Sequence, residues 1–218
     1  MEDLVNAVAT THPDMAAFIH HCHLRRFPAK YTIIKPGDKG ETFFYIVEGS
    51  VSVSMIDADG HELVLAYINK GEFVGEVGVF LGEMVRYVTV RTREPCQFAE
   101  ISYQRFHQLI HTDLAPHATG VMFMMAKQLA GRLLTTNRKV GDLAFTDVTG
   151  RISHTLMDLC KQPDAMTHPE GMQIRITRQE LGRIVGCSRE MAGRVLKELQ
   201  NQKLIDVKGK TIVVYGTR

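Results

Sequence analysis

The segment from Thr177 to Gln200, TRQELGRIVGCSREMAGRVLKELQ, constrains the fold more than any other part of the chain. Thr177 and Glu180 have the spacing of a capping box, in which a Thr hydroxyl and a Glu three residues later close the start of a helix. Gly186 supplies a left-handed residue that ends a helix, and Ser188 can cap the next one. The segment therefore predicts two packed helices joined by a very short turn, as in a helix-turn-helix.

Each predicted helix carries one apolar stripe for a shared core. The stripes consist of Leu181, Ile184 and Val185 in the first helix and of Met191, Val195, Leu196 and Leu199 in the second. Arg189, Glu190 and Arg194 lie near the start of the second helix on another face. Arg matches guanine O6 and N7, and Glu accepts from cytosine N4, so these side chains suit the major groove. The alternative is a solvated face with a Glu190 to Arg194 ion pair, but the capped two-helix context favours DNA reading.

The residues after the second helix extend this prediction. Two β-branched runs flank Lys208, Gly209 and Lys210, which predicts a hairpin with a basic tip that contacts phosphate. Residues 148–218 hold 12 Lys and Arg against 7 Asp and Glu, whereas the rest of the chain holds 14 against 17. Positive charge is thus concentrated in the part that would face DNA, and the region reads as a winged helix-turn-helix.

The composition of the whole chain bounds its class. With 218 residues, 44% of them hydrophobic, the chain is long enough for two domains with real cores. No apolar run reaches the roughly 18 residues of a membrane span, and the first residues lack a signal-sequence pattern. We therefore expect a soluble cytoplasmic protein with no membrane partner.

Cysteine usage and catalytic motifs argue against several other classes. Cys22, Cys96, Cys160 and Cys187 are scattered, so the sequence predicts neither a disulfide framework nor a metal centre. The run from His20 to His23 holds four possible ligands, but adjacent side chains cannot all face one ion. The chain has no nucleophile elbow, Walker loop or metal triad, so we expect no catalytic residues, no metal and no enzyme.

Between Tyr31 and Tyr103, short apolar runs alternate with Gly-rich turns such as that at residues 57–60, which predicts an antiparallel roll or barrel. The segment at residues 71–80, GEFVGEVGVF, interrupts this rhythm with three glycines whose backbone N–H groups can cradle a phosphate. Glu76 suits a ribose hydroxyl and Arg86 a phosphate. The alternative is that these glycines mark turns or bulges.

After Pro116 the pattern changes to a long helix whose apolar stripe recurs at steps of three or four. The stripe consists of Met122, Met125, Leu129, Leu133, Thr136, Val140 and Leu143. Its length predicts a two-stranded coiled coil between two copies of the chain. Packing against the roll of the same chain is the alternative, and the two are compatible. In a homodimer the paired DNA readers would bind a palindromic site.

From about residue 20 to its end, the chain resembles the cyclic AMP receptor protein (catabolite activator, CRP/FNR) family. The resemblance is carried by KVGDLAFTDVTGRI, QPDAMTHPEGMQIRITRQELGRIVGCSRE and VKGKTIVVYGTR. It implies an α+β fold with a jelly-roll-like β-roll cyclic-nucleotide-binding domain over residues 1–115. A dimerisation helix and hinge would follow over residues 116–146, and a winged helix-turn-helix over residues 147–218. A cyclic nucleotide effector is implied, with no other cofactor.

The resemblance also implies roles for individual residues of the C-terminal domain. Arg189, Glu190 and Arg194 would read a TGTGA-like half-site, and residues 145–147 would form the hinge between domains. The DNA contacts expected are Thr177, Arg178, Ser188, Arg189, Glu190, Arg194, Lys197, Lys208 and Lys210. Thr167 and His168 would match the surface that contacts RNA polymerase.

The expected ligand pocket departs from the family pattern at two positions. The positions that match are Gly75, Glu76 and Arg86 for phosphate and ribose, and Thr136 for adenine. Tyr87 stands where the family has a small serine beside the phosphate, and Asn137 stands where it has a second serine reached from the partner subunit. Unless the Tyr87 ring swings out, cyclic AMP binding should weaken.

The link before the dimerisation helix, HTDLAPHATG, also departs from the family pattern, because it is longer than in the enterobacterial activator. Together with GEFVGE, VTVRTR and CSREMAGRVLK, it resembles the CAP-like protein (Clp) branch, in which unliganded protein binds DNA and cyclic di-GMP releases it. We expect a homodimeric DNA-binding regulator with altered nucleotide specificity, cyclic di-GMP being favoured slightly over cyclic AMP. The alternatives are an apo-active regulator with a vestigial pocket and a ligand-binding adaptor without DNA function. A haem or redox sensor is disfavoured because no cysteine cluster or axial histidine setting exists.

Overall fold

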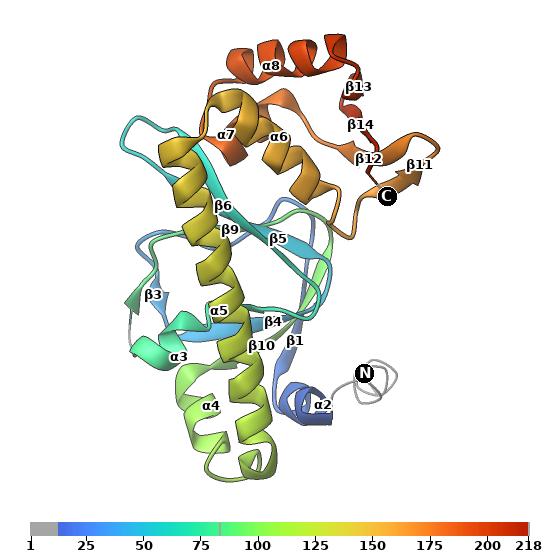
Figure 1. The fold of residues 1–218 in the computed structure, drawn as a ribbon. Helices are drawn as coiled ribbons and strands as arrows, with labels where there is room; N and C mark the ends of the chain where they lie inside the picture. The colour runs from blue at the N-terminus through green and yellow to red at the C-terminus, as the bar shows by residue number, and fades with distance from the viewer. Residues whose placement is uncertain (1–12, 83, 218) are drawn as a thin grey trace. The chain divides into compact units, whose positions relative to one another are not determined.

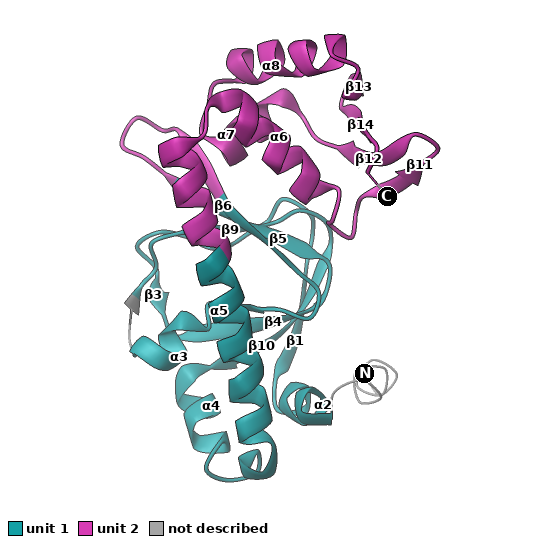
Figure 2. Cartoon of the chain, in the orientation of Figure 1, with its two compact units in different colours: residues 1–55, 65–134 teal, residues 56–64, 135–218 magenta. Residues whose placement is uncertain are grey.

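The computed structural model describes residues 13–82 and 84–217. These residues fall into two compact units, which Figure 2 draws in different colours. The sensor unit lies within residues 1–55 and 65–134, and the reader unit lies within residues 56–64 and 135–218. A β-rich part and a helical part in this order confirm the predicted α+β class.

Mostly short strands, with a few short helices among them, precede one long helix (Figure 1). The elements up to that helix are α2 (Pro13–His20), β1 (His23–Phe27), β2 (Thr32–Ile34), β3 (Lys39–Gly40), β4 (Thr42–Glu48), β5 (Ser50–Ile56), β6 (Glu62–Asn69), β7 (Phe73–Val74), α3 (Val77–Leu81), β8 (Met84–Val85), β9 (Thr89–Thr92), β10 (Cys96–Ser102) and α4 (Tyr103–Leu109). The long helix is α5 (Ala115–Phe145), which begins in the sensor unit and ends in the reader unit. The elements after it are α6 (Val148–Leu159), β11 (Met166–His168), β12 (Gly171–Arg175), α7 (Arg178–Val185), α8 (Arg189–Asn201), β13 (Ile205–Lys208) and β14 (Thr211–Tyr215).

The strands of the sensor unit form the predicted roll. Two four-stranded sheets have the orders β1-β10-β4-β7 and β2-β9-β5-β6, and the short strands β3 and β8 pair with each other. The consecutive side chains from Phe43 to Val47 of β4 are all buried. Because alternate side chains of a strand point to opposite sides, both faces of β4 are covered. Phe44 and Ile46 belong to the core that includes Val51 and Val90 of the other sheet. The apolar run TFFYIV therefore indicates a strand covered on both sides.

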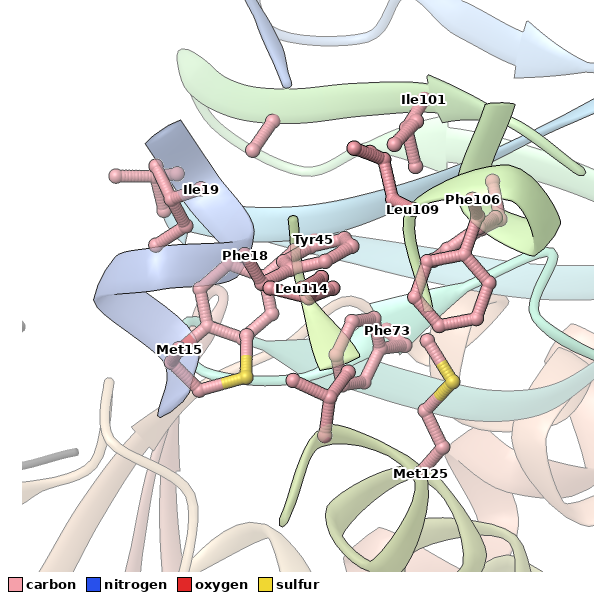
Figure 3. Close-up of a cluster of buried hydrophobic side chains, with 14 residues drawn as sticks. Met15, Phe18, Ile19, Tyr45, Phe73, Ile101, Phe106, Leu109, Leu114 and Met125 are labelled. Carbon is pink, nitrogen blue, oxygen red and sulfur yellow. The ribbon is translucent and has the colours of Figure 1, made fainter. Parts of the chain in front are cut away.

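The second face of β4 packs against helices. Figure 3 shows this cluster, in which Phe18 of α2 and Phe106 of α4 meet edge to face at 5.9 Å between ring centroids. Phe43 of β4 and Met125 of α5 are fully buried in the same cluster. Burial of each such side chain contributes roughly 1.5–3 kcal/mol relative to exposure. The first half of α5 is thereby fixed to the roll.

The reader unit has a separate core. Helices α6, α7 and α8 pack with a four-stranded sheet of order β11-β12-β14-β13. Ile152, Leu156 and Leu181 from the first two of these helices are at most 2% exposed. Asp147 caps α6 by accepting a hydrogen bond from the N–H of Gly150 at 2.8 Å. This cap begins a new helix two residues after α5 ends at Phe145.

The caps of the two predicted helices are present in the structure. The Thr177 hydroxyl accepts from the N–H of Glu180, and the Ser188 hydroxyl accepts from that of Met191, both at 3.1 Å. Gly186 adopts the left-handed conformation between them, with φ 69° and ψ 50°. Local sequence therefore sets the start of both helices and the end of the first.

One predicted core residue is wrong. Met191 is 37% exposed, and Ala192 is fully buried in its place. Ala192, Val195, Leu196 and Leu199 follow steps of three, one and three, which place them on a single helix face. A small Ala suits the first turn because α7 and α8 approach each other closely at their short connection.

The domain boundaries predicted at residues 115/116 and 146/147 remain a prediction. Among the helices that the structure describes, none combines the length and apolar character needed to cross a bilayer.

Candidate functional site

Helix α8 presents a row of polar side chains to solvent. Arg189, Glu190, Arg194 and Lys197 are all exposed, whereas the opposite face of the helix is buried in the reader core. Glu190, Arg194 and Lys197 lie at steps of four and three and therefore share one face. The helix offers donors and acceptors of the types that distinguish base edges in the major groove.

Residues outside α8 add positive charge to the reader unit. The side chain of Arg178, at the start of α7, lies beside Gly193 of α8, so it is held next to the row just described. Strands β13 and β14 pair from Ile205–Val214 to Lys208–Thr211, which places Gly209 and Lys210 at a two-residue hairpin tip. Lys208 is exposed and forms an ion pair with Asp206 at 3.0 Å. That partner raises the pKa of Lys208, so its positive charge is retained.

The predicted polymerase surface lies on a different hairpin of the same unit. Thr167 is exposed and His168 is half-buried, both in β11, whose strand pairs with β12. The N–H of Glu170 donates to Nδ1 of His168 at 3.3 Å, which holds the turn after β11.

In the sensor unit, the glycine-rich segment packs around the Arg86 guanidinium. Arg86 donates to the carbonyl oxygens of Gly75, at 3.3 Å, and of Thr42. Tyr103 donates its hydroxyl hydrogen to the same Gly75 oxygen at 2.6 Å. A Cβ at Gly78 would lie 2.4 Å from the Tyr103 ring, so only glycine admits this contact. The structure therefore brings Gly75 and Arg86 together.

Glu76 is the most deeply buried acidic side chain of this segment. It is 1% exposed, and its Oε1 lies 2.5 Å from Nη1 of Arg132 in α5. Among the residues that the structure describes, Glu76 Oε2 and Arg132 Nε are buried without a hydrogen-bond partner. Burial raises the pKa of the Glu76 carboxyl above its ordinary value, and the Arg132 charge opposes this shift. An unpartnered buried acceptor is costly, so this oxygen is suited to a ligand hydroxyl.

The other predicted ligand residues are exposed. The Tyr87 side chain is 68% exposed, so its ring does point outward. Thr136 and Asn137 are exposed on α5 and belong to the reader unit. The part of the expected pocket that one unit assembles consists of Gly75, Glu76 and Arg86.

Sequence reasoning missed three residues that hold this part of the site, namely Arg132, Tyr103 and Gln128. Gln128 donates from Nε2 to the Gly71 carbonyl at 3.0 Å and accepts from the Phe73 N–H at 2.9 Å. A polar pair four residues apart on a helix that otherwise buries apolar side chains was the available signal.

The geometry suits a phosphorylated ribose better than a metal ion. A buried carboxylate acceptor and a nearby guanidinium match a sugar hydroxyl and a phosphate. Within residues 13–82 and 84–217, one group of three metal-ligating side chains comes together, at Asp57, Asp59 and His61. All three are exposed, and Asp57 Oδ1 already accepts from the N–H groups of the other two, which closes the β5-β6 turn.

Comparison with known proteins agrees with both halves of this description. Residues 24–113 match the cyclic nucleotide-binding domain, and residues 174–205 match the bacterial regulatory proteins of the crp family. The chain is 53% identical over 208 residues to the cAMP-activated global transcriptional regulator CRP of Salmonella typhimurium, covering 95% of this chain and 97% of that protein. The chain belongs to the crp family. Members of this family are transcriptional regulators that bind DNA, and the protein is accordingly a regulator and not an enzyme.

Other crp-family relatives are equally similar. The cAMP-activated global transcriptional regulator Vfr of Pseudomonas aeruginosa is 53% identical over 218 residues, covering 97% of this chain and all of that protein. The structure of the c-di-GMP responsive global regulator CLP of Xanthomonas campestris superposes with a TM-score of 0.89 at 51% identity, covering 94% of this chain and 99% of that one. The crp-family fold is thus shared with regulators named for two different nucleotides.

Proposed function

We propose that the protein is a homodimeric transcriptional regulator whose affinity for a palindromic TGTGA-like site is set by a cyclic nucleotide bound at Glu76 and Arg86. The Oε2 of Glu76 is buried and meets no hydrogen-bond partner in the part of the chain that the structure describes. It carries the nucleotide part of this proposal, because a ribose hydroxyl would satisfy it. Arg86 would exchange a backbone carbonyl for the stronger, charge-assisted contact with phosphate. Gly75 supplies the backbone between these two groups.

DNA reading is assigned to the exposed row of α8. Arg189, Glu190 and Arg194 would contact base edges, with Lys197 beside them. Contacts to phosphate would come from the surrounding residues, namely Thr177, Arg178, Ser188, Lys208 and Lys210. Phosphate contacts fix the position of the reader, and base contacts give it specificity.

Dimerisation is assigned to an exposed face of α5. Seven exposed residues recur at alternating steps of three and four, namely Phe123, Ala126, Ala130, Leu133, Asn137, Val140 and Ala144. Six of them are apolar, and Phe123, Leu133 and Val140 are 72%, 60% and 59% exposed. This heptad spacing is the seam of a two-stranded coiled coil, and one Asn at such a position favours a dimer. Met122 and Met125 of the stripe predicted from sequence pack on the roll instead.

The effector is assigned as cyclic di-GMP in slight preference to cyclic AMP. Tyr87 and Asn137 replace the two small serines that the family places at the cyclic AMP site. Both side chains are larger than serine, and both are exposed, so each could change which nucleotide is preferred. The similar CLP protein is described as c-di-GMP responsive, which supports the same choice.

Thr167 and His168 are assigned to contact with RNA polymerase. The cytoplasm is proposed as the compartment in which the protein binds DNA and polymerase.

An alanine substitution tests the reader assignment. Arg189→Ala should weaken binding to a TGTGA palindrome by about tenfold or more, since a good bidentate base contact is worth about 1–3 kcal/mol. Its affinity for a scrambled duplex should change much less. The exposed Arg105 of α4 provides the matched control, and Arg105→Ala should leave both affinities unchanged. Retention of full sequence discrimination by Arg189→Ala would remove the assignment.

A further inference from the structure

Strand β7 lies at the edge of its sheet and pairs with β4 along one side. Its other side is met by side chains of α5. The N–H of Phe73 donates to Gln128 Oε1 at 2.9 Å, and the Phe73 carbonyl accepts from Arg132 Nη2 at 2.5 Å. Helix side chains thus supply the hydrogen bonds that a neighbouring strand would otherwise make.

The Gln128 amide reaches a second backbone group of the same segment. Its Nε2 donates to the Gly71 carbonyl at 3.0 Å, so one side chain spans Gly71 and Phe73. Arg132 lies one helical turn further along α5 and extends the contact to Glu76. Residues 71–76 are therefore attached to α5 at successive points, which end at the proposed ribose acceptor.

We infer that Gln128 is a positioning residue that makes residues 71–76 and α5 move together, so that a nucleotide at Glu76 acts on the long helix. This inference rests on the proposed function. A ligand that bonds to Glu76 Oε2 also perturbs the carboxylate that Arg132 holds. Residues 71–73 cannot follow that change separately from α5, because Gln128 holds backbone donor and acceptor groups rather than a mobile side chain. Allosteric coupling requires such a shared element between the effector and its response.

The chemistry of the amide allows a sharp test. Gln128→Met keeps the length of the side chain but loses both hydrogen bonds. Gln128→Glu keeps an acceptor for the Phe73 N–H and places a second oxygen against the Gly71 carbonyl, which repels it. Gln108 is exposed on α4, so Gln108→Met is the same chemical change at a neutral position.

The measurement is the ratio of DNA dissociation constants with and without saturating nucleotide, for a TGTGA palindrome at fixed salt. Cyclic AMP and cyclic di-GMP are used in separate titrations, and circular dichroism verifies that each variant is folded. We expect both Gln128 variants to reduce the ratio about tenfold toward one. Gln128→Met loses two hydrogen bonds, and Gln128→Glu loses one and adds a repulsion between two oxygens. Gln108→Met should keep the wild-type ratio. A purely structural role would lower the melting temperature and leave the ratio at saturation unchanged.

Two outcomes would overturn the inference, and they differ in what else they remove. If the wild type responds to a nucleotide and a folded Gln128 variant keeps the full ratio, the inference fails alone. If the wild-type ratio is one for both nucleotides, the proposed function fails, and the inference fails with it.

Discussion

Glu76 presents Oε1 to Arg132 Nη1 at 2.5 Å, while its Oε2 is buried and meets no donor among the described residues. The two oxygens of one carboxylate are therefore placed for different partners. Arg132 fixes the orientation of the side chain, and the second oxygen keeps its capacity for a ligand. In the proposed function, this division lets the second oxygen receive a ribose hydroxyl.

Removal of the ligand 2′-hydroxyl tests this relationship. Wild-type protein should bind a 2′-deoxy cyclic nucleotide about tenfold more weakly than the ribonucleotide, because a hydrogen bond to a charged group is lost. Glu76→Gln should bind the ribonucleotide more weakly and should discriminate little between the two ligands. Isothermal titration of both proteins with both ligands gives the coupling directly. Equal discrimination by wild type and variant would place the hydroxyl elsewhere.

The burial of Glu76 also predicts a pH dependence of stability. Burial raises the pKa of this carboxyl above its ordinary value of 4.5, so the folded state binds the proton more tightly than the unfolded state. The resulting stabilisation is complete below pH 4.5 and is lost as the pH rises through the folded-state pKa. The free energy of unfolding of wild type minus that of Glu76→Gln should therefore fall with rising pH. Urea titrations across this range check the slope, and a difference that grows with pH would contradict it.

Gly186 should resist substitution for a backbone reason. Its φ of 69° is left-handed, which strains any residue with a Cβ. A clash adds nothing to this strain, because a Cβ there would lie 3.4 Å from Leu143 Cδ2, an ordinary contact. Gly186→Ala should therefore cost about 1–2 kcal/mol in free energy of unfolding, and Gly186→Asn should cost less because Asn tolerates this conformation. Equal losses in the two variants would show that side-chain volume matters instead.

The outward Tyr87 ring predicts a separation of stability from specificity. With 68% of the side chain exposed, Tyr87→Ser should change the free energy of unfolding by no more than about 0.5 kcal/mol. The double variant Tyr87→Ser with Asn137→Ser restores the small residues of the family pattern and should shift preference toward cyclic AMP. The ratio of dissociation constants for cyclic AMP and cyclic di-GMP measures this shift. An unchanged ratio would mean that neither residue determines specificity.

Local signals explain why much of the reader was predictable from sequence. The caps at Thr177 and Ser188 and the left-handed Gly186 act within four residues, so the pattern alone determines them. Met191 was misplaced because Met191 and Ala192 stand four and three residues before Val195, and both steps fit a helical stripe. The choice of Ala192 depends on how closely α7 and α8 approach, which is a tertiary property.

The sensor site was predictable only in part, because some of its contacts join residues that are far apart in sequence. The glycine segment, Glu76 and Arg86 lie close in sequence and carry recognisable chemistry. Gln128 and Arg132 bond to residues 55 to 59 positions away, and their type and spacing did not indicate which segment they would hold. The division of α5 between roll packing and an exposed seam likewise depends on burial.

The most direct test of nucleotide control is fluorescence anisotropy with a TGTGA palindromic duplex at fixed, stated salt, because phosphate contacts make affinity salt-dependent. The duplex is titrated with ligand-free protein and then with protein saturated by cyclic AMP or by cyclic di-GMP. We predict tight binding by the free protein that is lost on addition of cyclic di-GMP. Identical affinity in all three titrations would contradict control by a nucleotide at Glu76 and Arg86.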